Sequence, residues 1–256
     1  MKKKFGQNFL NNQEIVNKII DAADINKNSI VYEIGPGDGI ITKEIIKKNP
    51  KIFYCIEIDS SLKPRLENFF NNKNYKLIFD NALTFDEKIF LNQNVTIISN
   101  LPYNISLKLL TKWCHQQSSH GWIKEMILMF QKEVAERILA TENTKKFGRI
   151  TVLSSALFEV SNIIDVNKIN FNPAPKVHSC VLKFTSLKKP YIDKNELVKL
   201  ESLSRELFSN KRKKLKKKIL AIFNPETILL HKLEDLYNLR AENLPKHTIY
   251  YLAKIL

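Results

Sequence analysis

Short apolar segments alternate with polar or helical stretches through the first half of the chain, and this alternation constrains the fold more than any other feature. Each segment is apolar throughout rather than at every second residue, as in strands buried on both faces of a parallel sheet. Helices that cover such a sheet lie between its strands. The sequence therefore predicts an α/β fold, with a helix over residues 14–23 and strands over residues 30–34, 52–58, 76–79, 95–99 and 126–130.

Two further apolar segments, residues 150–158 and 177–184, lie near the end of this block and suit a pair of strands at the edge of the sheet. From Asp193 to Leu256 only helical patterns follow. A chain of 256 residues is long enough for one α/β domain and a small appendage. We expect a first domain over residues 1–187 and a helical domain over residues 188–256.

The net charge of +15 points to a polyanionic partner such as a nucleic acid. Residues 188–256 hold 16 basic and 8 acidic side chains, against 25 and 18 in the first 187 residues, so the helical part is the more basic per residue. Seven of the eight residues from Lys211 to Lys218 are basic, and on a helix they would cover nearly every face except that of Leu215. Two alternatives stay open. The net charge could reflect a lysine-rich composition produced by an AT-rich genome, and the basic run could be a charged helix that only faces solvent.

The chain lacks the sequence features of membrane, secreted and metal-binding proteins. No apolar run reaches the ~18 to 20 residues of a membrane-spanning helix, and the N-terminus lacks the apolar stretch of a secretory signal. Cys55, Cys114 and Cys180 are far apart, and the five histidines form no metal-binding signature. We therefore expect a cytoplasmic protein with no membrane partner, no disulfide framework and no bound metal.

A glycine-rich loop follows the first strand expected in the sheet, where a doubly wound sheet binds nucleotide-like ligands. In its sequence, EIGPGDG at residues 33–39, Gly35, Gly37 and Gly39 allow a tight turn and a close approach of a ligand to the backbone. Ile40 stands where a dinucleotide-binding fingerprint has its last glycine, which disfavours a pyrophosphate site. The carboxylate of Glu33 would repel phosphate and attract a cation such as a sulfonium.

Two more acids end the next two strands. Glu57 lies about twenty residues beyond the glycine loop, the distance at which a carboxylate accepts both ribose hydroxyls of an adenosyl group. Asp80 ends the third strand, where its carboxylate could accept the adenine amino group. Each acid alone could be a solvated strand end, but three of them around a glycine loop indicate an S-adenosylmethionine site rather than an NAD site.

The fourth strand ends in the sequence NLPY at residues 100–103, which suits chemistry on an amine. The side-chain carbonyl of Asn100 and the backbone carbonyl of Leu101 can each accept one N–H of an adenine amine, which favours the tetrahedral nitrogen that attacks a methyl group. Pro102 fixes its own φ and helps to direct the Leu101 carbonyl, and Tyr103 offers a ring on which a flipped base can stack. The alternative is a plain turn capped by Asn100, with Tyr103 in the core.

Taken together, these motifs resemble those of the rRNA adenine N6-dimethyltransferases, and the resemblance runs over almost the entire chain. Within this family, the chain is similar to the bacterial enzymes that dimethylate two adjacent adenosines near the 3′ end of small-subunit rRNA. The motifs that carry the resemblance, in the order of the family, are KFGQNFL at residues 4–10, EIGPGDG at 33–39, Glu57, DNA at 80–82, NLPYNIS at 100–106, QKEVAER at 131–137 and NPAPKVHS at 172–179.

The resemblance implies a Rossmann-like class I S-adenosylmethionine-dependent methyltransferase domain with a largely parallel seven-stranded sheet, followed by a small helical RNA-binding domain. The expected partner is small-subunit rRNA in an immature small ribosomal subunit, and we expect a monomer. Phe171 would sandwich the target base opposite Tyr103. The residues expected at the cofactor are Asn8, Leu10, Glu33, Gly35, Gly37, Glu57, Asp80, Ala82 and Asn100, and those expected at the RNA include Lys211, Arg212, Lys213 and Lys214.

Three other functions fit parts of the pattern. One is the related methylation of a single adenosine in large-subunit rRNA, which confers macrolide resistance; NLPY rather than NIPY, and RAENLP at residues 240–245, lean against it. The second is a ribosome-assembly factor that uses the same fold only to bind RNA, which the intact Asn100 and cofactor acids weaken. The third is a DNA adenine methyltransferase, which the family resemblance disfavours.

Overall fold

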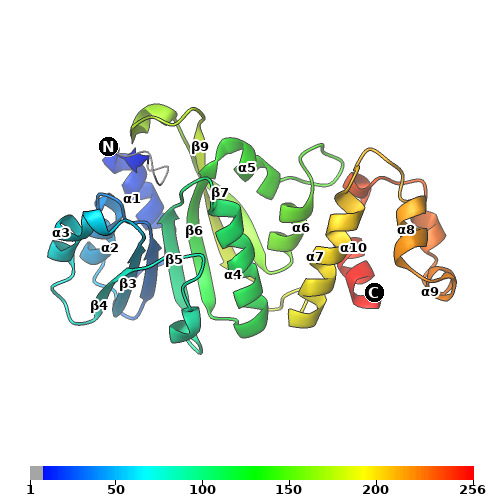
Figure 1. Ribbon diagram of the computed structural model, residues 1–256, viewed down its shortest axis with the longest axis horizontal. Helices are drawn as coiled ribbons and strands as arrows, with labels where there is room; N and C mark the ends of the chain where they lie inside the picture. Colours follow the sequence, from blue (N-terminus) through cyan, green and yellow to red (C-terminus); the bar gives the residue numbers. More distant parts are fainter. Residues whose placement is uncertain (1–7) are drawn as a thin grey trace. The chain divides into compact units, whose positions relative to one another are not determined.

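The apolar segments of the first half of the chain form the parallel part of a seven-stranded sheet. In the computed structural model, which describes residues 8–256, the strand order is β4-β3-β2-β5-β6-β9-β7 (Figure 1). Neighbouring strands from β4 to β6 pair in parallel, and β9 pairs with β6 in antiparallel orientation. The strands are β2 (Ile30–Ile34), β3 (Ile52–Glu57), β4 (Tyr75–Phe79), β5 (Val95–Asn100), β6 (Ile123–Gln131), β7 (Phe158–Val166) and β9 (Ser179–Ser186).

Helices cover the sheet on both faces because its strands carry apolar side chains on both sides. On one face, Val31 and Phe53 share a core cluster with buried side chains of α1 and α2. On the other face, Tyr32 packs against Phe90 with ring centroids 4.8 Å apart, and Trp113 of α4 is fully buried. The helices of this part of the chain are α1 (Gln13–Ala22), α2 (Ile40–Lys47), α3 (Lys63–Leu66) and α4 (Ser106–His120).

A two-stranded antiparallel ribbon fixes the beginning of the described chain. It pairs β1 (Phe9–Leu10) with β8 (Phe171–Asn172), and the backbone N–H of Asn11 continues the pairing by donating to the Asn170 oxygen at 2.9 Å. Asn12 then caps α1, since its side chain accepts the N–H groups of the first helical turn. Because the Asn12 side chain also donates to that of Asn170, 158 positions later, the ribbon holds the N-terminal segment against a distant loop.

The chain forms two compact units, and the second is discontinuous in sequence. The first unit runs to Ala135 and resumes over Glu159–Ser186, whereas the second comprises Glu136–Phe158 and Leu187–Leu256. The chain enters the second unit for the last time at Leu187, next to the boundary expected between residues 187 and 188. The segment Glu136–Phe158, which the sequence prediction placed in the first domain, belongs to the helical unit.

The helical unit is built around α7, whose apolar side recurs every three or four residues. Asp193 caps this helix in a reciprocal capping box with Glu196, and α10 and α6 pack against it. Leu197, Leu200 and Leu207 are fully buried. The helices are α6 (Arg149–Ser155), α7 (Lys194–Phe208), α8 (Lys216–Ile222), α9 (Pro225–Leu230) and α10 (Lys246–Ile255), and α5 (Lys132–Ile138) precedes them at the first crossing.

The prediction of a strand over residues 150–158 is wrong. Residues 149–155 form α6 and the strand begins only at Phe158. Val152 and Ser154 are fully buried, so the segment is surrounded by protein on all sides, and a short apolar run of this kind has no periodicity that separates a buried helix from a buried strand. The expected pair of strands at the sheet edge does exist, but β7 and β9 form it.

No helix within residues 8–256 is long and apolar enough to cross a membrane.

Candidate active site

A cavity of about 210 Å³ opens at the carboxyl ends of β2, β3, β4 and β5. Because the ends of parallel strands meet at one edge of the sheet, loops that are far apart in sequence converge there. The wall brings together eleven of the residues expected at the cofactor or the target base, namely Asn8, Leu10, Gly35, Gly37, Glu57, Asp80, Ala82, Asn100, Leu101, Pro102 and Tyr103.

The glycine loop forms one wall of the cavity and depends on its glycines for two different reasons. Gly35, Gly37 and Gly39 all have positive φ, between 58° and 85°. A Cβ at Gly37 would lie 2.8 Å from the Phe9 ring, so this glycine allows β1 to approach the loop. A Cβ at Gly35 would meet no atom within 4 Å, so Gly35 leaves open space in the cavity that a ligand can fill.

Glu57 connects the cavity with the glycine loop. Its Oε1 accepts the backbone N–H groups of Ile58 and Asp59 at 2.9 Å, and its Oε2 lies 3.4 Å from the Gly37 nitrogen. Burial raises the pKa of Glu57, and the three backbone N–H groups oppose that rise. The carboxylate is thus held at the cavity wall with a fixed orientation, as an acceptor for a diol requires.

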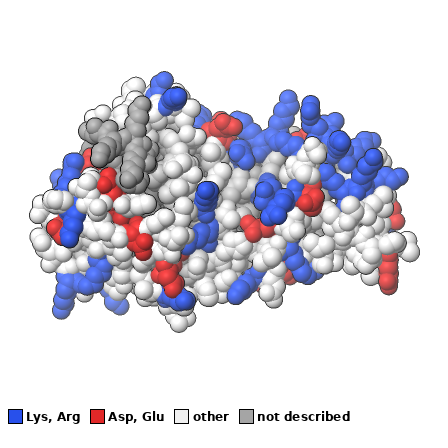
Figure 2. Space-filling view, viewed as in Figure 1, with Lys and Arg blue, Asp and Glu red and all other residues white. Residues whose placement is uncertain are grey.

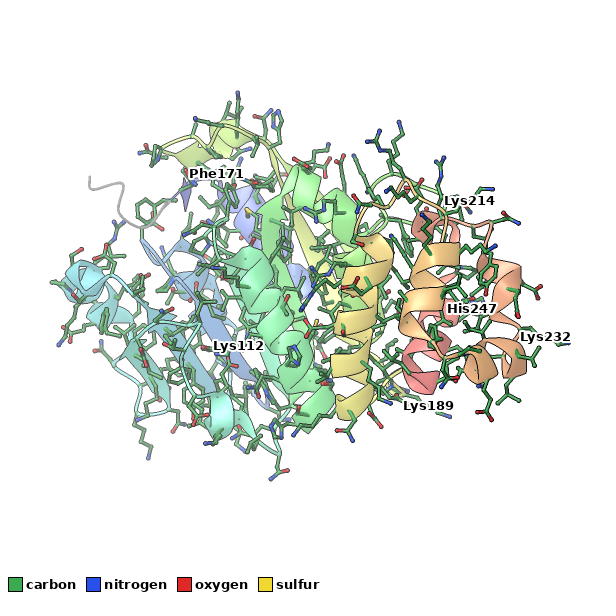
Figure 3. All side chains as sticks on the ribbon, turned by 45° about the vertical axis from the view of Figure 1, so that its right-hand side comes forward. Lys112, Phe171, Lys189, Lys214, Lys232 and His247 are labelled. Carbon is green, nitrogen blue, oxygen red and sulfur yellow. The ribbon has the colours of Figure 1, made fainter. Side chains whose placement is uncertain are left out.

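The loop after β4 forms the opposite wall and is held from α4. Asp80 is exposed and accepts the N–H of Asn81 through Oδ1 at 2.6 Å. Lys112 of α4, labelled in Figure 3, donates to the backbone oxygens of Ala82 and Phe85 at 2.8 Å each. Its ammonium group also lies 3.3 Å from the buried carboxylate of Glu87. These contacts fix the position of Asp80 and Ala82 relative to the sheet.

The charge of the cavity suits a cationic ligand. Asp38, Glu57 and Asp80 line it, and the described part of its wall contains no lysine, arginine or histidine. Such a wall disfavours a phosphate and stabilises a sulfonium. Asp38 was not among the predicted site residues, although it stands in the glycine loop itself, because Glu33 was expected to supply the negative charge of that loop.

Glu33 does not reach the cavity. Its side chain is 1% exposed and accepts a hydrogen bond from the Thr42 hydroxyl at 2.7 Å, beneath the first turn of α2. Burial raises its pKa to about 8, so the carboxyl is largely protonated at neutral pH. The structure therefore corrects the expectation that Glu33 contacts the cofactor or attracts its positive charge, and shows it joining β2 to α2.

We expect Glu33→Gln to change the pH dependence of stability. The folded carboxyl has a pKa of about 8 and the ordinary value is 4.5, so between these values the folded chain keeps a proton that the unfolded chain releases. This group's contribution to stability therefore falls as pH rises from about 4.5 to 8. Glutamine has no such proton, so the melting temperature of the variant, relative to that of the wild type, should rise from pH 5 to pH 8. A difference in melting temperature that is the same at every pH would contradict the buried, protonated state.

Asn100 ends β5 with its side-chain amide in a defined orientation. Its Nδ2 donates to the backbone oxygen of Asn8 at 3.1 Å, and both residues line the cavity. Because the nitrogen is used in this contact, Oδ1 is the atom left to accept a hydrogen bond from a ligand amine. The preceding residue, Ser99, fixes the strand end by donating to the Ile34 oxygen at 2.6 Å.

Tyr103 lies in the turn between β5 and α4 and is only partly buried. The turn is closed by a hydrogen bond from the Ile105 N–H to the Pro102 oxygen at 3.1 Å. The Tyr103 hydroxyl lies 2.6 Å from the Ser179 hydroxyl, and burial raises the pKa of the phenol, so it stays protonated at neutral pH. Tyr103 lines the cavity together with Asn100.

Phe171, the predicted second aromatic of a base sandwich, is not brought to the cavity. Figure 3 places it in the ribbon with β1, where it pairs with Leu10. Its side chain is 3% exposed and belongs to the core cluster that includes Val16 and Met129. In this structure Phe171 is a core residue that supports the N-terminal strand, and it presents no free face to a base.

Comparison with known proteins identifies the family. The sequence profile described as ribosomal RNA adenine dimethylase matches residues 1–256. The chain belongs to this family. It is 38% identical over 253 residues to the ribosomal RNA small subunit methyltransferase A of Pelagibacter ubique, with 99% of this chain and 95% of the relative covered. It is 40% identical over 248 residues to the protein of the same name from Borreliella burgdorferi, with 95% and 84% covered.

Solved structures agree with the assignment to the ribosomal RNA adenine dimethylases. The crystal structure of a dimethyladenosine transferase from Plasmodium falciparum superposes with a TM-score of 0.81 at 28% identity, covering 95% of both chains. A 23S rRNA methyltransferase, ErmE, has a TM-score of 0.70 at 21% identity, covering 96% of this chain and 99% of the other, and shows the fold alone. The predicted family, Rossmann-like methyltransferase fold and enzyme class are confirmed.

The cavity of this ribosomal RNA adenine dimethylase fits the cofactor of its family, S-adenosylmethionine. Three acidic side chains and the open space at Gly35 match a cation with an adenosyl group. Glu57, Asp80 and Gly35, the residues expected at the ribose, the adenine amine and the methionine end, all line this cavity. S-adenosylmethionine, when bound, supplies the methyl group and the positive sulfur from which it departs.

The basic run of the helical unit does not form one helix as the sequence suggested. Lys211 to Leu215 make a turn, Lys214 bridges to Arg240, and α8 begins only at Lys216. The turn arises because Leu215 is fully buried and its N–H donates to the Leu239 oxygen. Arg212, Lys213 and Lys214 are exposed, and Figure 2 shows basic side chains gathered along this edge of the unit.

A second basic segment, which the sequence did not single out, joins this edge from the discontinuous part of the helical unit. Lys145 and Lys146 lie in the loop before α6, and the ammonium group of Lys211 donates to the Lys145 backbone oxygen. Asn143 fixes the loop by hydrogen bonds with Glu242 and Asn243. No signal in the sequence links these lysines with Lys211, because the contact forms only when Glu136–Phe158 folds together with the C-terminal helices.

Proposed function

We propose that this ribosomal RNA adenine dimethylase transfers methyl groups from S-adenosylmethionine to the N6 amines of two adjacent adenosines near the 3′ end of small-subunit rRNA. It would act as a cytoplasmic monomer on immature small ribosomal subunits during ribosome biogenesis. The observation that carries this proposal is the oriented amide of Asn100 at the mouth of an acidic cavity. The relatives named for the small subunit, which match nearly the whole chain, support the choice of RNA.

Asn100 and Leu101 would act on the target amine. Oδ1 of Asn100 accepts one N–H and the Leu101 carbonyl the other, off the plane of the base. Two acceptors in this position favour tetrahedral nitrogen and stabilise the positive charge that develops on it as the methyl group arrives. A strong general base is not required, because the alkylated ammonium loses its proton readily.

Tyr103 would hold the adenine. A base that is turned out of its RNA helix needs a surface on which to stack, and a tyrosine ring supplies roughly 1 to 3 kcal/mol per base. Tyr103 lines the same cavity as Asn100, so a base stacked on its ring would bring its amine near Oδ1.

The decisive experiment offers labelled S-adenosylmethionine with immature small subunits and, separately, with unmodified large-subunit RNA, followed by digestion to nucleosides. Dimethyladenosine at about two per small subunit is the expected result. Label only in large-subunit RNA would assign the chain to the resistance branch. No label in either RNA would favour a non-catalytic assembly factor.

The exposed lysines of the helical unit are expected to bind RNA phosphates. Replacing Lys213, Lys214, Lys216 and Lys217 with glutamine should lower the slope of log affinity against log salt by up to about 0.7 to 0.9 for each phosphate that is no longer neutralised. Anisotropy of labelled RNA over a salt series measures the slope.

A matched control removes the same charge from the other end of the unit. Lys188, Lys189, Lys194 and Lys199 are exposed, and Figure 3 shows Lys189 and Lys214 at opposite ends. Their replacement should leave the slope closer to that of the wild type. Equal slopes for the two quadruple variants would show that only net charge matters, and an unchanged slope would make the basic run plain solvated surface.

A further inference from the structure

Ser179 is a buried hydroxyl in a rigid part of the sheet, and the functions assigned above do not use it. It is the first residue of β9, it pairs with Gln131 of β6, and it is 0% exposed. The residue before it is also held, because the His178 oxygen accepts the Lys132 N–H at 2.9 Å. The position of the Ser179 hydroxyl is therefore set by backbone pairing on both sides.

The Ser179 hydroxyl forms a hydrogen bond with a residue of the cavity wall. Its Oγ lies 2.6 Å from the hydroxyl of Tyr103, which belongs to the turn after β5, 76 positions earlier in the chain. At its other end, the backbone oxygen of Tyr103 accepts the Ser106 hydroxyl at 3.1 Å. The Tyr103 side chain is thus tethered at the tip and its backbone at the turn, while the residue lines the cavity.

We infer that Ser179 is a positioning residue, which holds the hydroxyl end of Tyr103 and so fixes the direction in which the ring points for stacking of the target adenine. The inference rests on the proposed function, since it requires Tyr103 to be the stacking surface. It also gives the Tyr103 hydroxyl a structural role, in which the phenol anchors the ring to β9 and exchanges no proton with the substrate. The raised pKa of the phenol agrees with a hydroxyl that keeps its proton.

The tether matters because a stacking surface works through its orientation. An untethered ring can swing about the Cα–Cβ bond into another rotamer, toward solvent or into the cavity, so only part of the population would place its face where the amine aligns with Oδ1 of Asn100. A small misplacement of a bound group lowers the rate of a transfer reaction more than it lowers binding. Removal of the tether should therefore reduce the rate of methyl transfer and leave cofactor affinity nearly unchanged.

A double-mutant cycle of Ser179→Ala and Tyr103→Phe isolates this hydrogen bond. Each single variant removes the same interaction, so each should slow single-turnover methyl transfer to immature small subunits by about tenfold, and the double variant should be no slower than the worse single one. Independent roles would instead multiply to about a hundredfold. Cofactor affinity, measured by calorimetry, should stay within about twofold in all three variants, and a thermal melt confirms folding.

Ser186→Ala is the matched control. Ser186 ends the same strand, at the opposite end from Ser179, and its hydroxyl donates to the Ile123 oxygen. The Ser186→Ala variant should transfer methyl groups at the rate of the wild type. Ser179→Cys keeps a donor at this position, although a weaker one on a larger atom; its rate should lie between those of wild type and Ser179→Ala, and it serves as the test if the alanine variant does not fold.

The outcomes separate this inference from the proposed function. If Tyr103→Ala transfers methyl groups at the wild-type rate, the stacking role of Tyr103 and the positioning role of Ser179 both fall, whereas the proposed transfer reaction stands. If Tyr103→Ala is slow but Ser179→Ala is as fast as wild type, the function stands and the positioning role is overturned. The same holds if the two effects multiply in the double variant, because Ser179 would then act independently of the Tyr103 hydroxyl.

Discussion

Replacing Asn100 with alanine is expected to lower the rate of methyl transfer by about 10²- to 10³-fold, the range seen when one acceptor or donor aimed at a developing charge is removed. The amide of Asn100 is oriented by the Asn8 oxygen and leaves Oδ1 for the substrate. The alanine variant would lack the proposed interaction with the target amine, which strengthens as that amine becomes positively charged. Single-turnover transfer to immature small subunits measures the rate, and RNA affinity should stay within a few fold.

Asn100→Asp tests the orientation of the side chain separately from its acceptor oxygen. Aspartate keeps an oxygen near the position of Oδ1, but a second oxygen would face the Asn8 carbonyl, which needs a donor. We expect this variant to be nearly as slow as the alanine variant. Asn94→Ala, at an exposed position before the same strand, should behave as wild type. Substantial transfer by Asn100→Ala would remove Asn100 from the mechanism.

Replacing Glu57 with alanine is expected to weaken S-adenosylmethionine binding by at least about a hundredfold. The change removes the acceptor proposed for the ribose hydroxyls, and charge-assisted hydrogen bonds of this kind contribute ~1.5 to 3 kcal/mol each. It also releases the backbone N–H groups of Ile58 and Asp59 and the contact with the Gly37 nitrogen. Calorimetric titration with the cofactor or its demethylated product measures the affinity.

Glu57→Gln and Glu67→Ala are the controls for that effect. Glutamine keeps one oxygen that can accept the N–H groups of the loop, so the cofactor affinity of Glu57→Gln should lie between those of Glu57→Ala and the wild type. Glu67 is exposed beside Lys63, away from the described cavity wall, and its replacement should leave affinity unchanged. An affinity within a few fold of wild type for Glu57→Ala, in a variant that melts normally, would show that another group holds the ribose.

The parallel sheet could be predicted because its strands are apolar over most of their length. In β5, Val95 to Ser99 are all buried, and no helix on a protein surface carries such a run. The segment at residues 150–158 is also largely apolar, but Arg149–Ser155 forms a helix that packs against α7. Which neighbours a buried segment receives depends on the tertiary fold, and composition does not contain that information.

The position of the site residues along the chain could be predicted, but not always the direction of their side chains. Glu33 and Glu57 both stand at or near the end of a strand next to the glycine loop. Glu57 reaches the cavity as the last residue of β3, whereas Glu33 lies one residue before the end of β2 and turns under α2 toward Thr42. Since side chains alternate between the faces of a strand, one residue of register decides between a ligand contact and a buried support.

Phe171 differs from sequence expectation for a related reason. The family resemblance indicated an aromatic ring at the target base, but the pairing of Leu10 with Phe171 places the ring in the core. That pairing joins segments from the two ends of the methyltransferase unit. Neither segment has enough strand-forming residues to indicate a ribbon by itself, so the contact could be found only from the structure.

The discontinuous helical unit also determines where the chain can be cut without losing part of that unit. Its two pieces, Glu136–Phe158 and Leu187–Leu256, are separated by the strands that complete the sheet edge. Because β7 and β9 are neighbours, and the Leu187 N–H donates to the Leu157 oxygen, closing that edge brings α6 next to the start of α7 and shortens the loop that α6 and α7 must close. A fragment that starts at residue 188 would lack α6, one of the helices against which α7 packs, and would not contain the whole helical unit.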